Sequence, residues 1–425
     1  MKKFLGMIMS WIVVLSLLGM PCSSQAAGLY LYELGMPEVG LAGAGWAARA
    51  QDAATVFTNP AGMVRLDRSE LMVGIQPLYL NVEFDADKNT TASGKDGDAR
   101  TWLPTGGTYY VHNLAPDLKL GMAVSGYFGL GLDYGDSWVG RYYVDEVTLQ
   151  AMGIQPALAY RANDWLSMGL GVNVLYAVFE KTAAVNNIAP SLPDGRLKVE
   201  DEDWTLQANV GVLVEPWKGT RFGLTYLSEG ELEFDDRPEF SGLGPGLNAI
   251  LGNLGLLNAR LDLEMTMPQS LMFSVYHDMN DKWAVMANLG WQDWSEFGMV
   301  GVTVSAEDIT SLTVDRDYDD TWHGALGLQY RVSEPWRLSA GAAYDSAMVD
   351  EKDMTPDLVS GEQWRFGLGA QYDWSENLTL GCAYELVWTG DLDMEVNRGP
   401  LAGRVSGTYE DTAMHFININ LIWKF

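Results

Sequence analysis

Apolar residues recur at every second position through most of this chain. In residues 164–180, Leu, Met, Val and Tyr side chains alternate with mostly small or polar ones. Residues 204–216 and 261–275 show the same pattern, with Thr, Gln, Asn, Asp or Glu between many of the apolar positions. Alternation of this kind predicts β-strands that have one apolar face.

The length of these segments separates two kinds of β protein. Strands of soluble proteins usually end near about 5–6 residues, whereas about 9–11 tilted residues already cross a bilayer. A soluble sandwich buries its apolar face against a second sheet, and a membrane barrel turns that face toward lipid. Because several of the segments are long enough to cross, we predict an all-β transmembrane barrel.

Short and long connections alternate along the chain. Short polar or Pro-containing turns are expected at 115–118, 163–166, 215–218, 280–283, 333–336 and 375–378. Longer, largely acidic connections are expected at 85–99, 129–145, 182–203, 236–258, 305–320, 348–361 and 395–410. Turns at one end and loops at the other are typical of an outer-membrane barrel.

Counting the strands between these connections predicts a 14-stranded antiparallel barrel, an even number that allows closure. The strands are expected at roughly 69–84, 100–113, 118–128, 146–162, 164–181, 200–217, 219–235, 259–278, 282–304, 320–332, 336–347, 362–374, 378–394 and 411–425.

The first 26 residues predict export. Lys2 and Lys3 precede an apolar stretch from Phe4 to Met20, and residues 24–26 offer small side chains for cleavage after Ala26. A membrane anchor is the alternative, but the apolar stretch is short for a spanning helix. A lipoprotein site at Cys22 fits poorly with the proline before it. We therefore expect a signal peptide at 1–26.

Composition narrows the function classes. The formal net charge of −29 argues against nucleic-acid binding, since phosphates attract the opposite sign. Cleavage would leave Cys382 as the single cysteine, so we expect no internal disulfide. Tyr and Trp are too frequent for a disordered chain, and 46 Gly residues indicate many strands and turns.

The segment before the first strand is a candidate plug. A barrel of about 8 strands is filled by its own side chains, whereas 16–18 strands leave an open channel, so 14 strands leave a lumen to fill. Residues 27–68 are too irregular for the wall, and Pro60 and Gly62 end the segment with a turn. We expect residues 27–68 to form an N-terminal plug and residues 69–425 to form the barrel.

Sites for catalysis, cofactors or metals are not expected. The four His residues have no metal-ligand spacing, and Gly40–Gly45 does not match the dinucleotide-binding pattern. The acidic run 315–320 lacks the order of a Ca²⁺ loop, so solvation is the better reading. A hydrolase using Ser125 or Ser274 is the enzymatic alternative, but no His lies near either in sequence. We predict no enzyme and no cofactor.

Several ordered motifs resemble one family. They are DAA at 52–54, NPA at 59–61, LDR at 66–68, QPALAYR at 155–161, MPQ at 267–269, WQDWSEF at 291–297 and the aromatic residue Phe425 at the end of the last strand. In this order the chain resembles the FadL-type outer-membrane transporters of long-chain fatty acids and other hydrophobic compounds. The resemblance covers essentially the whole chain after the signal peptide.

The resemblance implies a transport route. Residues 27–68 would be a hatch inside the barrel, with its hinge at Asn59, Pro60 and Ala61. A kink in the third strand would open the wall sideways, so that the cargo leaves into the outer membrane. Gly126, Gly129 and Gly131 are candidates for that kink, because glycine weakens strands, although they also fit an ordinary loop.

The expected function is passive uptake of hydrophobic compounds across a bacterial outer membrane, with long-chain fatty acids first. Neutral hydrocarbons or aromatics, a general porin and a surface adhesin are the alternatives. We expect a monomer whose partners are its hydrophobic cargo and outer-membrane lipid. Arg141 and Lys181 are candidate partners for a carboxylate. A capture site is expected in loop 236–258, which an amphipathic rim helix would also explain, at Leu243, Leu247, Ile250, Leu251, Leu254 and Leu257.

Overall fold

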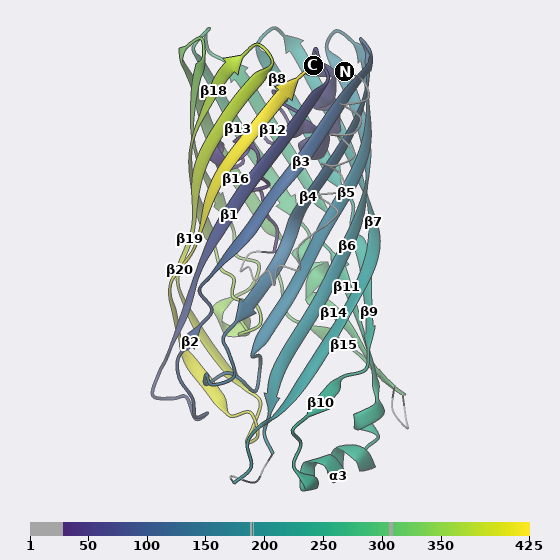
Figure 1. Ribbon diagram of the computed structural model, residues 1–425, viewed down its shortest axis with the longest axis vertical. Helices are drawn as coiled ribbons and strands as arrows, with labels where there is room; N and C mark the ends of the chain where they lie inside the picture. The colour runs from purple at the N-terminus through teal and green to yellow at the C-terminus, as the bar shows by residue number, and fades with distance from the viewer. Residues whose placement is uncertain (1–28, 188, 190, 306–308) are drawn as a thin grey trace.

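The structure is a computed structural model that describes residues 29–187, 189, 191–305 and 309–425, so the expected signal peptide lies outside the described residues. Fourteen antiparallel strands form a closed wall, in which β20 pairs with β1 and β8 pairs with β7 (Figure 1). The predicted 14-stranded barrel is confirmed. The wall strands are β1 (Glu70–Ala86), β3 (Thr101–Ala115), β4 (Leu118–Asp133), β5 (Glu146–Asn163), β6 (Leu166–Val185), β7 (Gly195–Trp217), β8 (Thr220–Leu227), β12 (Ser270–Asp278), β13 (Trp283–Gln292), β16 (Thr321–Ser333), β17 (Trp336–Asp345), β18 (Gln363–Ser375), β19 (Leu378–Asn397) and β20 (Arg404–Lys424).

A second, four-stranded sheet continues part of the wall on the loop side. Its order is β15-β14-β11-β9, and each strand follows or precedes a wall strand in the chain. Three segments predicted as single strands are therefore divided, at Ser228, at Pro268 and at a helical turn after Gln292. Pro268 has no N–H to give to a ladder. These strands are β9 (Gly230–Asp236), β11 (Arg260–Met267), β14 (Met299–Ser305) and β15 (Ile309–Asp315).

The remaining elements are short. They are η1 (Pro37–Leu41), α2 (Thr55–Thr58), η2 (Pro60–Arg65), β2 (Gly97–Asp98), β10 (Glu239–Ser241), α3 (Pro245–Asn253), η3 (Leu256–Asn258), α4 (Trp294–Gly298) and η4 (Glu351–Asp353). None of the described helices is long and apolar enough to cross a membrane. The short turns and the C-terminus lie at one end of the barrel, and the long loops with α3 lie at the other (Figure 1).

The wall strands expose the apolar face that their alternation predicts. Leu326 is 71% exposed, and Ile75, Leu368 and Ile419 lie on the same outer surface. Near the loop end, outward Trp side chains pair across neighbouring strands, as Trp291 does with Trp322 and Trp364 with Trp388. Aromatic side chains at this level mark the membrane–water interface of a barrel.

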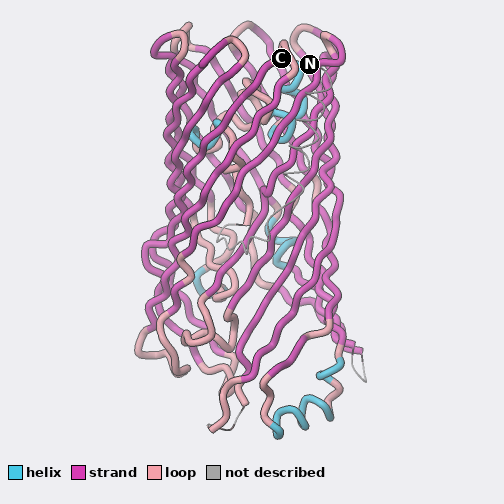
Figure 2. The backbone as a smooth tube through the Cα atoms, in the orientation of Figure 1, coloured by secondary structure: helices cyan, strands magenta, loops and turns pink. Residues whose placement is uncertain are grey.

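The N-terminal segment lies inside the barrel, toward the turn end (Figure 2). Its residues 29–66 are almost all buried. Inward polar side chains of the wall bond to its backbone. Asn288 receives the N–H of Gly45 at 2.8 Å, and the Asn209 amide donates to the carbonyl of Phe57 at 2.7 Å. These side chains satisfy irregular backbone that has no ladder of its own.

Glycine in the wall lets the segment approach the strands closely. A Cβ placed on Gly74 of β1 would lie 1.6 Å from the carbonyl oxygen of Gly35, and one on Gly223 of β8 would lie 1.9 Å from that of Ala47. No larger side chain fits at either place without moving the segment. Part of the high glycine content therefore serves contact between the barrel and the N-terminal segment.

Buried ion pairs hold the segment together and to the wall. Arg49 bonds to Glu38 at 2.7 Å and also to Asp52, and all three side chains are almost fully buried. Arg365 of β18 pairs with Glu33 in the segment and, at 2.6 Å, with Asp345 of β17. A buried charge that loses its partner is strongly destabilising.

Replacing Arg49 with Met should loosen the segment, because Glu38 and Asp52 would be left buried without their cation. We expect the free energy of opening the segment to fall by about 3–5 kcal/mol. Amide hydrogen exchange within residues 29–66 would measure it as faster exchange. Arg100→Met is the matched control, since Arg100 also pairs with two carboxylates, Glu83 and Asp98, but at an exposed site. Equal exchange in both variants would contradict the role of Arg49.

Deleting residues 27–58 should convert a closed barrel into a leaky one, because the side chains of 14 strands do not fill the lumen. We expect a large rise in small-ion conductance in planar bilayers. The intact protein is the reference, and a conductance equal to that of the intact protein would show that the segment is not the plug.

Candidate functional site

An apolar cavity of about 400 Å³ lies between the loops and the N-terminal segment. Its walls come from β5, β6, β7, β11 and β14, and Leu29 of the N-terminal segment also lines it. This volume falls in the range of about 300–1,000 Å³ that is typical of small-molecule pockets. The apolar lining comprises Leu29, Val147, Leu149, Phe179, Ala183, Leu197, Val199, Leu261, Leu263, Met265, Phe297, Val300 and Leu358.

Charged side chains line one part of this cavity. Lys181 Nζ lies 2.6 Å from Asp357 Oδ2, and Arg316 Nη2 lies 3.6 Å from the same oxygen. Arg398 also lines the cavity, with its guanidinium 4.9 Å from the centre of the Tyr143 ring. The cavity lining therefore holds three cations and one carboxylate, of which Lys181 and Arg316 lie against Asp357, and this leaves an excess of positive charge.

The electrostatics of Asp357 follow from these neighbours. Burial opposes ionisation of its carboxyl group, but the positive charges of Lys181 and Arg316 outweigh burial and hold its pKa well below the usual range. Asp357 Oδ1 is buried and has no hydrogen-bond partner in the described structure. Asp357 is therefore an anion that pairs with Lys181 and Arg316, while its Oδ1 has no hydrogen-bond partner among the described residues.

The structure places the two predicted carboxylate partners in different surroundings. Lys181 lines the cavity, whereas Arg141 does not. Arg141 Nε instead lies 2.9 Å from Asp194 Oδ2, and its guanidinium also bonds to backbone carbonyls in the loops. Sequence reasoning missed Arg316, which stands in an acidic run, and Arg398, which stands in a long loop. Neither position carries a periodic signal that places it in the cavity.

Aromatic side chains lie between most of the N-terminal segment and the cavity, which only Leu29 among the described residues of this segment lines. Phe297 of α4 and Phe128 of β4 have ring centroids 5.9 Å apart, and Trp294 lies 6.0 Å from Phe128. Beyond them, Tyr127 contacts Phe57 at 5.2 Å. α4 thus reaches from the β13 side of the wall to β4, and its Phe297 forms part of the cavity lining.

The wall has a gap beside β4. The ladder between β3 and β4 ends at the pair Gly107–Ser125, although both strands continue toward the loops. Residues 29–31 take up the freed groups, since Leu31 N–H donates to Tyr127 O and Gly129 N–H donates to Leu29 O, each at 2.9 Å. The N-terminal segment therefore covers the edge of β4 where β3 has left it.

The three candidate kink glycines differ in their positions. An irregularity in the β4–β5 ladder lies between Ser125 and Phe128, so Gly126 falls within it. Gly129 and Gly131 pair in regular register farther along, with Gln150 and Thr148. A Cβ on Gly126 or Gly129 would meet nothing closer than 3.6 Å or 3.9 Å, so packing does not require glycine at either position.

The Asn59-Pro60-Ala61 turn lies against the wall. Asn59 caps η2 by accepting the Ala61 N–H, and its amide donates to the carbonyls of Ala47 at 2.7 Å and Val212 at 3.1 Å. It therefore links two parts of the N-terminal segment to β7. In this structure the turn is an anchoring point of the N-terminal segment on the wall, through the bond to Val212.

The predicted capture residues lie on and beside α3, which projects from the loop end of the barrel (Figure 1). Ile250 and Leu254 are about half exposed, whereas Leu247 is buried. The cavity has no lining residue from this group. Among the described residues, no group of three or more His, Cys, Asp or Glu side chains is placed to hold a metal ion.

Comparison with known proteins gives consistent results. A model of the family described as "Outer membrane protein transport protein (OMPP1/FadL/TodX)" matches residues 19–421. The chain is 26% identical over 395 residues to the long-chain fatty acid transport protein of Escherichia coli O6:H1, which covers 85% of this chain and 88% of that protein. It is 26% identical over 427 residues to outer membrane protein P1 of Haemophilus influenzae, which covers 90% of each.

Solved structures share the fold. A FadL homologue from Pseudomonas aeruginosa matches with a TM-score of 0.83 at 18% identity, over 94% of this chain and all of that one. The toluene transporter TodX from Pseudomonas putida matches with a TM-score of 0.70 at 16% identity, over 94% of this chain and 100% of that one. At these identities the likeness speaks for the fold alone.

The family match, the closed barrel and the apolar cavity agree on the class of protein. The matched proteins are transport proteins and channels, so the prediction that the chain is not an enzyme is confirmed, as is its place in the outer membrane. This chain belongs to the FadL/TodX family of outer-membrane transport proteins, which carry hydrophobic compounds.

Proposed function

We propose that this protein takes up long-chain fatty acids by passive diffusion through the outer membrane. The observation that carries the proposal is the composition of the cavity of about 400 Å³, whose lining is aliphatic or aromatic except for Lys181, Arg316, Arg398 and Asp357. An acyl chain suits the apolar lining, and a carboxylate suits an excess of positive charge. A neutral hydrocarbon carries no charge with which these cations could pair.

Burial of the chain supplies the driving force for capture. Each CH₂ group transferred from water to an apolar site gains about 0.8 kcal/mol, so a long acyl chain binds without an energy source. The charged head would then replace or share the contacts of Asp357. A charge-assisted hydrogen bond of this kind contributes about 1.5–3 kcal/mol, which is enough to separate an acid from a neutral chain of the same length.

Within this proposal, the exposed apolar side chains of α3 form the first landing surface. Ile250 and Leu254 lie outside the barrel, on the loop side where a molecule arrives from the medium. The cargo would next enter the cavity beneath the loops. At each of these two steps the cargo loses contact with water.

Release would occur sideways, through the gap between β3 and β4. The segment Leu29–Leu31 closes that gap with two backbone hydrogen bonds, and Leu29 also lines the cavity. A shift of the N-terminal segment about the Asn59-Pro60-Ala61 turn would free the edge of β4. The irregular ladder at Gly126 supports opening there. The cargo would leave directly into lipid, and the protein would act as a monomer.

The relatives support a fatty acid, and the rival is a small aromatic. The matched Escherichia coli O6:H1 protein is named a long-chain fatty acid transport protein, whereas a matched Pseudomonas putida structure is a toluene transporter. Toluene carries no charge, so it would gain nothing from Lys181 and its neighbours. The charged part of the cavity therefore favours the acid.

Lys181→Met should weaken oleate binding by about tenfold, because it removes a cation from the cavity while keeping the length of the side chain. Binding of oleate and of toluene to the purified protein would measure the effect, and toluene affinity should stay unchanged. Arg141→Met is the matched control, since Arg141 lies outside the cavity. Equal losses in both variants, or a loss for toluene, would contradict the assignment.

Asp357→Asn should strengthen oleate binding by about three- to tenfold. The substitution removes the anion that competes with a carboxylate for Lys181 and Arg316, and it keeps the shape of the side chain. The dissociation constant for oleate gives the readout, with oleyl alcohol as the neutral reference. If the affinity for oleate falls instead, Asp357 positions the cations rather than competing with the ligand.

A further inference from the structure

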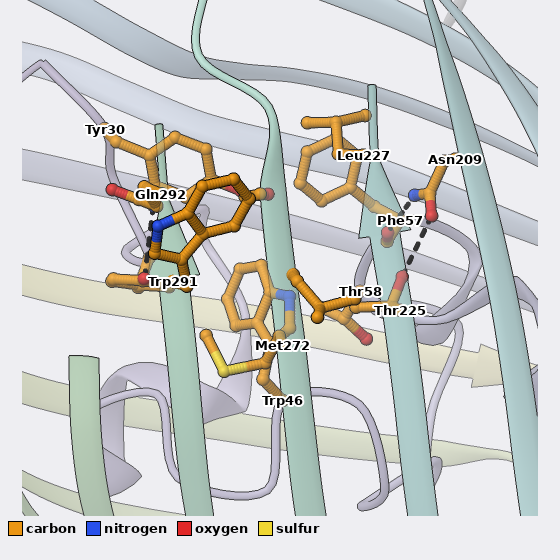
Figure 3. Close-up of a pocket in the computed structure, with 13 residues that line it drawn as sticks. Tyr30, Trp46, Phe57, Thr58, Asn209, Thr225, Leu227, Met272, Trp291 and Gln292 are labelled. Atoms are coloured by element: carbon orange, nitrogen blue, oxygen red, sulfur yellow. Dashed lines mark hydrogen bonds between the residues drawn. The ribbon is translucent and has the colours of Figure 1, made fainter. Parts of the chain in front are cut away.

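The wall is interrupted at one level across four neighbouring strands. β8 ends at Leu227, β12 begins at Ser270, β13 ends at Gln292 and β16 begins at Thr321. These four residues pair one with the next across the strands: Ser270 pairs with both Leu227 and Gln292, and Gln292 pairs with Thr321. Figure 3 shows neighbouring strands that end beside a segment of coil at this level. The break lies opposite β4, on a different part of the wall from the β3–β4 gap.

The break is widest between β12 and β13. Pairing on that side resumes only at Glu264 with Gly301, so residues 265–269 and 293–300 have no ladder between them. One backbone bond remains among these described residues, from Asp293 N–H to Gln269 O at 3.0 Å. On the other side, between β8 and β12, pairing resumes sooner, at Gly230 with Met267.

Side chains close the break on the outer surface. The Tyr226 hydroxyl donates to Gln269 Oε1 at 2.7 Å, and the Gln269 amide donates to Asp293 Oδ2 at 2.9 Å. Ser295 donates to the other Asp293 oxygen at 2.9 Å. A chain of polar side chains therefore stands where the rest of the wall has backbone hydrogen bonds. We call Tyr226, Gln269, Asp293 and Ser295 the outer bridge.

On the inside, α4 closes the break. Phe297 lines the cavity, while Trp294 donates its indole N–H to Gln292 Oε1 at 2.9 Å at the end of β13. Both rings are buried and face Phe128 across the lumen. α4 is thus the layer between the cavity and the break.

A narrow crevice of about 20 Å³ lies at the edge of the break (Figure 3). Its lining combines residues from inside the barrel with residues on the outer face of the wall. Tyr30, Trp46 and Phe57 belong to the N-terminal segment, whereas Leu271 and Trp291 occupy outward positions on β12 and β13. Polar side chains such as Asn209 and Gln292 line the crevice together with these aromatic and apolar ones, and it lies at the level of the outward Trp side chains.

We infer that the break between β12 and β13 is a second lateral passage, through which the acyl chain moves from the cavity into the outer leaflet. This inference rests on the proposed function. α4 and the outer bridge are its two closures, and displacement of α4 joins the cavity to the membrane face of the wall. The level suits a fatty acid, since its head remains at the interface while its chain enters the hydrocarbon.

A reversible cross-link tests the passage. Gln269 and Asp293 lie directly beside the register pair Ser270–Gln292 and are joined by one backbone and one side-chain hydrogen bond, so cysteines at these positions lie close enough to test for a disulfide, which needs Cα atoms about 4.4–6.8 Å apart. The variant Gln269→Cys/Asp293→Cys is made with Cys382→Ser, because Cys382 is an exposed thiol. The measurement is the initial rate of labelled oleate uptake by cells that lack their own transporter. We expect oxidation to lower the rate at least twofold and dithiothreitol to restore it.

The matched control is a second disulfide on the same strands. Phe273 and Leu289 are outward partners within the regular ladder of β12 and β13, so Phe273→Cys/Leu289→Cys cross-links a part of the wall that is already closed. We expect the same rate for its oxidised and reduced forms. An oxidised bridge variant that transports as fast as its reduced form would overturn the inference.

The opposite perturbation keeps the inference testable if the disulfide variant does not assemble. Gln269→Met removes two of the three side-chain bonds of the outer bridge, those that Gln269 makes, at constant length, and we expect the rate of oleate uptake to rise about twofold. An unchanged or lower rate would overturn the passage. If the Cys382→Ser parent carries no oleate above the empty vector, the proposed function itself fails, which is a different result from an ineffective cross-link.

Discussion

The structure depends on one constraint, which is that backbone N–H and C=O groups inside a lipid layer must be hydrogen-bonded. The wall meets this constraint by closure, since β1 pairs with β20 and β7 pairs with β8. A wall of this kind opens only where something else satisfies the freed groups. Among the described residues, its ladder is interrupted beside β4, where Leu29–Leu31 bond to the strand, and between β12 and β13, where the side chains of Gln269 and Asp293 bond to each other and α4 lies on the inside. Both places adjoin the cavity, which connects the closure of the fold to its transport.

The second requirement is a filled lumen. The N-terminal segment fills the turn end with irregular backbone. Inward amides of the wall, such as those of Asn209 and Asn288, donate hydrogen bonds to this backbone, and glycines such as Gly74 let it approach closely. The buried cluster of Glu38, Arg49 and Asp52 keeps the segment folded on itself. The apolar cavity occupies the loop end, and the proposed selectivity rests on the few charged side chains that line it.

Much of this fold could be predicted from the sequence, because alternation has a fixed physical cause. Successive side chains of a strand point to opposite faces, so the strands, their number and the positions of the turns follow from the pattern. The interruption at Ser228 could not be predicted, since apolar residues at even positions from Phe222 to Phe234 keep the same alternation on both sides of it. The cavity was only partly predictable. Lys181 stands at the end of a strand, but Arg316 and Arg398 reach the cavity through loops that fold inward, and Arg141 is held by Asp194. Contacts between distant loops leave no period in the sequence.

The central claim is that the cavity binds a hydrophobic chain and recognises its carboxylate. The most direct measurement is the affinity of the purified wild-type protein for oleate compared with oleyl alcohol, two ligands with the same chain and different heads. The account predicts that oleate binds about tenfold more tightly at neutral pH, because about 1.4 kcal/mol of charge-assisted bonding separates the two. Equal affinities, or tighter binding of the alcohol, would contradict it and would make the cavity a site for neutral hydrophobic compounds.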